Sequence, residues 1–122
     1  MPLPATGIVS TYADRFVNKG TSNGDVYTHE GWTAALLPCA RWHAVPLGHR
    51  YRVSYAGRSV VVKTNDSGAG DGSMERVLDL SRAAFAYLKG VPLASVTNGN
   101  AGLLYQASFE PVAATTPMGP VR

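Results

Sequence analysis

Asp66 stands where a segment rich in β-branched residues gives way to a turn. The segment 59–64 reads SVVVKT, and Asn65, Asp66, Ser67 and Gly68 follow it directly. A carboxyl group held at the end of a strand can serve as a general acid or base. The same four residues are also typical of a turn in which Asn and Asp side chains bind backbone amides. The residues alone favour the turn.

A second set of residues raises the question of a metal site. Cys39, His43 and His49 fall close together in the sequence, and His29 could add a fourth ligand. Their spacing matches none of the usual zinc patterns, and separate strands would have to bring them together by chance. The sequence therefore predicts no metal and no other cofactor.

The charged residues are distributed unevenly along the chain. No acid occurs between Glu30 and Asp66, whereas four acids fall within the segment 66–79. A basic surface beside an acidic pocket would suit a polymer that carries negative charges, although a solvated face explains the same pattern. No motif or aromatic interleaving indicates a nucleic-acid partner. The bases of the acid-free stretch are Arg41, Arg50, Arg52, Arg58 and Lys63.

Length and composition predict a single globular domain. The chain has 122 residues, of which 45% are hydrophobic and 16% are charged, and a chain of this size can bury one core without disulfides. No apolar run approaches the roughly 18 residues that would span a membrane. The first residues lack the charged and apolar regions of a secretory signal, so either export follows another route or a leader is missing. One cysteine cannot form an internal disulfide.

The hydrophobic pattern predicts mostly short strands. The clearest signal is a hairpin, because polar and apolar residues alternate on both sides of Ala56 and Gly57. Glycine accepts the positive φ that a tight turn needs. The expected strands are 7–13, 31–37, the two arms of the hairpin within 50–65, 76–80 and 101–111.

One helix is expected at 82–89, with Ser81 as its N-cap and Gly90 as its stop. About six short strands with one helix indicate an all-β fold, and a closed barrel removes the exposed edges that short strands otherwise leave. The expected organisation is an N-terminal arm at 1–6, one barrel domain, and a flexible tail at 111–122.

The order of six segments resembles the double-psi β-barrel of the rare lipoprotein A family, whose members bind or cleave bacterial peptidoglycan. A more distant similarity joins it to expansins and barwin-type barrels. The resemblance implies a six-stranded double-psi β-barrel with one short helix, and peptidoglycan or a related glycan as partner. The segments are GIVSTYADRF, GTSNGDVY, WTAAL, VPLGHRYRV, GRSVVVKTNDSG and RVLDLSRAAFAYL, and the resemblance covers residues 7–110.

The resemblance assigns catalytic roles to Asp66 and Asp25. In active members the aspartate of an N-D-x-G motif is the general acid and later the base, and Asp66 occupies that position. Cleavage of a glycosidic bond needs a proton on the leaving oxygen, which a partly desolvated carboxyl can supply. Asp25 matches a second family acid, although Asn-Gly-Asp is also an ordinary solvated turn. The two carboxyls are expected within about 10 Å of each other.

The resemblance also implies substrate contacts. Tyr12, Asn65, Ser67 and His43 are the candidates, and Tyr12 is expected to stack on a sugar ring because an aromatic face complements the C–H face of a pyranose. Asp79 matches the family as well. Its position two residues before the expected N-cap favours a structural role at the helix N-terminus.

Two departures from the family place the activity in question. The enzymes usually carry a histidine after the T-A-A strand, where this chain has Leu36. His43 could fold back to replace the missing imidazole. Leu36→His is expected to raise activity if the rest of the groove is intact. The segment after Asp66 also lacks the family's arginine, proline and aromatic. The sequence therefore predicts binding with weak or undetectable cleavage.

Three functions remain open at this point. The first is a lytic transglycosylase that acts through Asp66, and the second is an expansin-like barrel that binds the wall without cleaving it. The third is a bacteriophage virion or tail protein that uses the same barrel, a setting that needs no secretory signal. The corresponding locations are the extracellular or periplasmic wall zone and the phage particle, with the cytoplasm as a remaining option.

Overall fold

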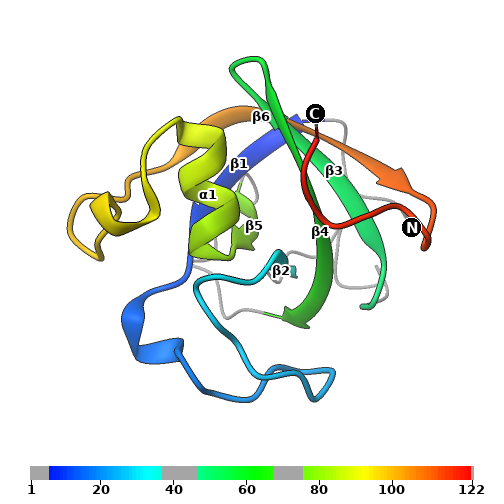
Figure 1. Ribbon diagram of the computed structural model, residues 1–122, viewed down its shortest axis with the longest axis horizontal. Coiled ribbons are helices and arrows are strands. Elements are labelled where there is room, and N and C mark those ends of the chain that lie inside the picture. Colours follow the sequence, from blue (N-terminus) through cyan, green and yellow to red (C-terminus); the bar gives the residue numbers. More distant parts are fainter. Residues whose placement is uncertain (1–5, 37–46, 68–75, 122) are drawn as a thin grey trace.

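The computed structural model describes residues 6–36, 47–67 and 76–121, which form a closed β-barrel with one α-helix against it (Figure 1). The strand order is β2-β5-β1-β6-β3-β4, and a further pairing of β2 with β4 closes the ring. The six-stranded, all-β barrel expected from the sequence is confirmed. The barrel strands are β1 (Thr6–Thr11), β2 (Thr33–Leu36), β3 (Arg50–Tyr55), β4 (Arg58–Ser67), β5 (Arg76–Leu80) and β6 (Leu104–Val112).

The ring contains both parallel and antiparallel strand pairings. The pairings of β1 with β5 and of β2 with β4 are parallel, and the other four are antiparallel. The register shifts between Ile8 and Val9 and between Ala34 and Ala35. Such bulges bend a strand and re-aim its side chains, which a small barrel needs in order to close.

The hairpin of β3 and β4 forms where the sequence predicts it. Ala56 and Gly57 have φ angles of 51° and 85°, and a two-residue hairpin turn of type I′ requires positive φ at both positions. Tyr55 pairs with Arg58 across this turn. β4 is covered along its middle by neighbouring elements, and its valines at 60–62 are all buried.

The predicted helix α1 (Arg82–Lys89) is confirmed, and it packs against the barrel with β4 as its main partner strand (Figure 1). Gly90 ends it with a φ of 82°. The helix follows Ser81 as predicted, but the hydroxyl of Ser81 makes no capping hydrogen bond. It donates instead to the carbonyl oxygen of Gly31 at 2.7 Å, which ties the start of the helix to the segment before β2.

Two 3₁₀ helices, η1 (Asp14–Phe16) and η2 (Leu93–Ser95), lie in the connections after β1 and after α1. Both are single turns without buried residues. Among the described residues, no helix has the length and apolarity needed to cross a membrane.

The C-terminal segment is attached to the barrel. β6 extends to Val112, and a short strand β7 (Gly119–Pro120) pairs with β4. The amide of Val121 donates to the carbonyl oxygen of Ser59 at 3.0 Å. The described part of the tail that was expected to be flexible, 111–121, is thus held against β4 by backbone pairing.

Two groups of buried side chains stabilise the barrel. The main core joins the inner faces of the strands to one face of α1, and Phe85 and Leu88 are its helix contribution. A second, smaller cluster consists of Tyr12, Tyr27 and Ala35. This tyrosine cluster lies at the end of β1 and beside β2, and it forms the base of the candidate site.

Gly90→Ala is expected to lower the free energy of unfolding by roughly 1–2 kcal/mol, because the left-handed conformation strains any residue with a β-carbon. An added β-carbon would also lie 2.1 Å from the guanidinium group of Arg58, which would have to move. Equilibrium unfolding in urea measures the change. Gly99→Ala is the matched control, since its φ is not left-handed and no atom lies within 4 Å of the added carbon. Equal losses in both variants would contradict the explanation.

Candidate functional site

Asp66 accepts hydrogen bonds from two segments that are remote in the sequence. It lies one residue before the end of β4, opposite Ala35 of β2. The Tyr12 hydroxyl donates to Oδ2 at 3.1 Å, and the Ser22 amide and hydroxyl donate to Oδ1 at 2.9 and 2.8 Å. These donors are 54 and 44 positions away, so the carboxylate joins separate segments of the fold and does more than stabilise a local turn.

The loop 20–26 brings Ser22 to Asp66. Its two ends meet in an antiparallel bridge. At its tip the amide of Asn23 donates to the carbonyl oxygen of Asn65 at 3.1 Å. Backbone hydrogen bonds thus dock the loop on the end of β4, independently of the side chain of Ser22.

Asp25 lies in the same loop and contacts β4 through its side chain. The Asn65 amide group donates to its carboxylate at 3.2 Å, and Lys63 forms an ion pair with it at 3.5 Å. The hydrogen bond from Asn65, together with the charge of Lys63, lowers the pKa of Asp25. Asp25 is therefore ionised at neutral pH. Asn65 is 1% exposed, so its side chain holds Asp25 and does not face a substrate.

Adjacent residues of β4 thus contact the same loop, Asn65 through Asp25 and Asp66 through Ser22. The loop with Asp25 and the strand end with Asp66 therefore lie against each other, and a shared catalytic site for the two acids stays a prediction. The separation of less than about 10 Å between their carboxyls stays a prediction.

Tyr12 is part of the buried tyrosine cluster. Its ring is stacked on Tyr27 with 3.9 Å between centroids, meets Phe16 edge-on, and is 4% exposed. The stacking on a sugar ring that the sequence suggested does not fit this burial. Burial raises the pKa of the Tyr12 hydroxyl well above its usual range, and Asp66 and then Asp79 raise it further. Tyr12 is therefore a neutral donor to Asp66.

Arg82 is a buried residue whose guanidinium group contacts the tyrosine cluster. It is 4% exposed, and its guanidinium donates to the Tyr12 carbonyl oxygen at 2.7 Å and to Asp14 at 2.6 Å. His29 bridges the Tyr27 hydroxyl and Asp14, at 2.6 and 2.8 Å. The histidine that could have joined a metal site thus belongs to this network, which fixes the backbone of Tyr12.

Leu36 packs into the main core with 6% of its surface exposed. Its neighbour Ala35 belongs to the other cluster, with Tyr12 and Tyr27. A side chain at position 36 therefore points away from the tyrosines beside Asp66. This packing does not support the expectation that Leu36→His supplies the missing imidazole, and the effect of that substitution stays a prediction.

Asp79 accepts a hydrogen bond from the hydroxyl of Ser10 on β1. Its charge also contributes to the raised pKa of Tyr12. Asp79 therefore belongs to the electrostatic surroundings of the site, a role that its position before α1 did not indicate.

The remaining candidates of the sequence are Cys39, His43, His49 and Ser67. Cys39 and His43 fall outside the described residues, and Ser67 is the last residue of β4. His49 is exposed. In the parts of the chain that the structure describes, no three His, Cys, Asp or Glu side chains are grouped to hold a metal ion.

Sequence reasoning missed Ser22 and Arg82 as parts of the site. Ser22 stands inside the quoted TSNGD and Arg82 inside DLSRAAF, so both lie in segments that carried the resemblance. An arginine within an otherwise apolar helix face is a signal for a buried ion pair, because burial requires a partner. No comparable signal indicates that Ser22 docks on a strand end.

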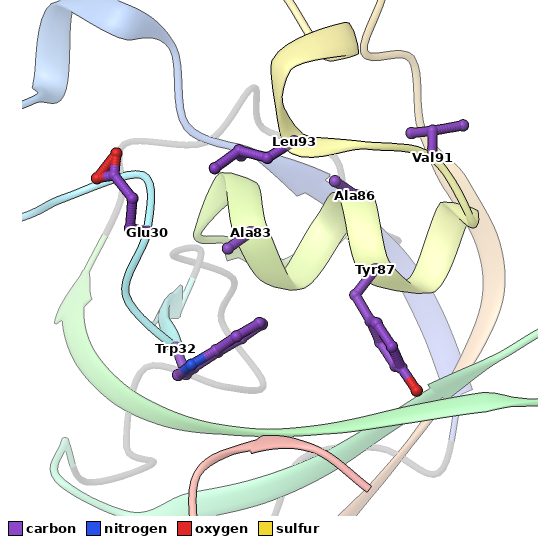
Figure 2. A pocket seen from close by; sticks show the side chains of 7 residues that line it. All are labelled: Glu30, Trp32, Ala83, Ala86, Tyr87, Val91 and Leu93. Carbon is purple, nitrogen blue, oxygen red and sulfur yellow. The ribbon is translucent and has the colours of Figure 1, made fainter. Parts of the chain in front are cut away.

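A separate hollow of about 360 Å³ lies against α1. Figure 2 shows Trp32 and Tyr87 on two sides of it, with Ala83 and Ala86 of α1 between them. Among the described residues, Glu30 is the only acid that lines it. Asp66 does not line it, so this hollow is not the candidate site.

Comparison with known families identifies the barrel. A family model described as lytic transglycolase matches residues 5–104, most of the chain. The chain belongs to this family. Its fold is accordingly the double-psi β-barrel of the proteins related to rare lipoprotein A, as the sequence predicted.

Two curated relatives are named endolytic peptidoglycan transglycosylase RlpA, from Neisseria meningitidis serogroup A and serogroup B strains. Each is 37% identical to this member of the lytic transglycolase family over 81 residues, which is 65% of the chain. The chain spans only 30% of the length of these relatives.

Solved structures show the same fold. A Streptomyces papain inhibitor has a TM-score of 0.63 at 24% identity, over 92% of this chain and all of that one. An expansin of Clavibacter michiganensis has a TM-score of 0.62 at 20% identity, over 93% of this chain and 52% of that one. A mutant of that expansin was solved with cellohexaose, and its TM-score is 0.60 at 19% identity, over 89% of this chain and 50% of that one. At these identities the likeness shows the fold alone.

The Asp14→Asn variant is expected to lose less free energy of unfolding in acid than the wild type does. The hydrogen bond from His29, then the charge and hydrogen bonds of Arg82, lower the pKa of Asp14 below 3.8. A lowered pKa means that the stabilisation is present above pH 3.8 and is lost as the pH falls through the folded-state value. Urea unfolding between pH 6 and pH 2 checks this, with Glu110→Gln as the control carboxylate. Parallel pH profiles for wild type and Asp14→Asn would contradict it.

Proposed function

We propose that this domain binds bacterial cell-wall glycan at the surface around Asp66 and cleaves it weakly, by a lytic transglycosylase reaction. The observation that carries the proposal is the Asp66 carboxylate, which Tyr12 and Ser22 hold at the end of β4. Family membership and the relatives named as peptidoglycan transglycosylases supply the substrate class.

The reaction needs one proton-transferring group. Asp66 in its acid form gives its proton to the glycosidic oxygen as the bond from that oxygen to C1 breaks. The resulting carboxylate takes the proton of the sugar's own 6-hydroxyl, whose oxygen then bonds to C1. The sugar closes as a 1,6-anhydro ring, no water is consumed, and Asp66 regains its proton.

Position 36 explains why we propose a weak enzyme. Enzymes of the family that the sequence resembles usually carry a histidine there, whereas this chain has Leu36, which packs into the main core. The groups whose hydrogen bonds to Asp66 are described above are a phenol, a backbone amide and a hydroxyl. Asp25 is held ionised by Asn65 and Lys63, so it supplies a negative charge near the oxocarbenium-like transition state and no proton.

Binding without cleavage is the alternative, and it uses the same surface. The fold likeness to an expansin is compatible with it. The matches named above include no virion or tail component, so the bacteriophage setting gains no support from them. The two remaining possibilities differ in whether Asp66 transfers a proton or only binds sugar hydroxyls.

Purified sacculi separate these possibilities. The wild-type domain should sediment with sacculi and release few or no anhydro-muropeptides, and Asp66→Asn should reduce any release by about 100-fold or more, because general acid–base assistance contributes about 10²–10⁴-fold. Mass spectrometry of the soluble fraction measures the release, with Glu110→Gln as control. Strong release that survives in Asp66→Asn would overturn the catalytic role, and failure to sediment would overturn the binding role.

Leu36→His is expected to destabilise the barrel by about 2–4 kcal/mol without raising release, because it puts an imidazole into the main core. Leu36→Met keeps the volume and is the control for packing. Thermal unfolding and the sacculus assay together test this. Higher release at unchanged stability would show that a histidine at position 36 reaches Asp66.

A further inference from the structure

Ser22 makes an unusual pair of contacts with Asp66. Its amide and its hydroxyl both donate to the same oxygen, Oδ1, at 2.9 and 2.8 Å. The Tyr12 hydroxyl donates to the other oxygen at 3.1 Å. Rotation of a carboxylate about its last bond is otherwise broad, so donors on both oxygens select one orientation.

The structure assigns to Ser22 the role of a positioning residue: we propose that its hydroxyl fixes the orientation of the Asp66 carboxylate for the glycan. This proposal rests on the proposed function and deepens it. The backbone of loop 20–26 is docked by other hydrogen bonds, including that of Asn23 with Asn65. The loop therefore stays in place when only the hydroxyl is removed.

The distinction between hydroxyl and backbone makes the role testable. Ser22→Ala removes the hydroxyl and leaves the amide, whereas Ser22→Thr keeps both donors. Ser54→Ala is the matched control, because it removes a hydroxyl that bonds Ser59 in the hairpin of β3 and β4. Since Ser22 is exposed, none of the substitutions at this position creates a cavity.

The first measurement needs no catalysis. High-resolution crystal structures report the χ2 rotamer of Asp66, which is the rotation of the carboxylate about its last bond. Wild type, Ser22→Thr and Ser54→Ala should each show one χ2 rotamer, whereas Ser22→Ala should show more than one. A single wild-type χ2 rotamer in Ser22→Ala would overturn the proposal.

The second measurement uses sacculi or a soluble glycan fragment. Loss of a hydrogen bond to a charged group should lower kcat, or the binding constant if turnover is undetectable, by about tenfold. KM should be retained in the catalytic case, and Ser22→Thr should restore the wild-type value. A kcat or binding constant of Ser22→Ala equal to that of the wild type would overturn the proposal. A wild type that neither binds nor cleaves would instead refute the proposed function, and the rotamer measurement would still decide the role of Ser22.

Discussion

The parallel pairing of β2 with β4 is the constraint on which the rest of the structure depends. It closes the ring of strands, and it places Ala35 opposite Asp66. Because β4 is buried along its middle, its end cannot shift without disturbing the core. The carboxylate of Asp66 is thus carried by a rigid strand, and the loop with Ser22 and the end of β1 with Tyr12 converge on it.

Burial and hydrogen bonding give the ionisable groups around Asp66 different states. Burial keeps Tyr12 a neutral phenol, so it donates a proton in a hydrogen bond and does not compete as an acid. Hydrogen bonding by Asn65 keeps Asp25 charged. The surroundings raise the pKa of Tyr12 and lower that of Asp25, so one group is a neutral hydrogen-bond donor and the other a fixed negative charge.

The sequence predicted those features that depend on neighbouring residues. The turn at Ala56 and Gly57 and the helix that ends at Gly90 follow from local backbone chemistry, and both are confirmed. The contact of Ser22 with Asp66 spans 44 positions, and no local pattern encodes it. The burial of Tyr12 was missed for the same reason, since its stacking partner Tyr27 comes from a separate segment.

Ala35 and Leu36 show that a sequence motif does not indicate which face of a strand a side chain occupies. Side chains alternate between the two faces of a strand, so a shift of one position exchanges the core face for the site face. The register of β2 against β4 shifts between Ala34 and Ala35, next to the position in question. A resemblance in sequence aligns Leu36 with a position of the family. The register shift in β2 determines which face of the strand the side chain at that position occupies. Here Ala35 packs with the tyrosines and Leu36 with the main core, so the barrel orients its carboxylate with hydroxyl groups from elsewhere in the chain.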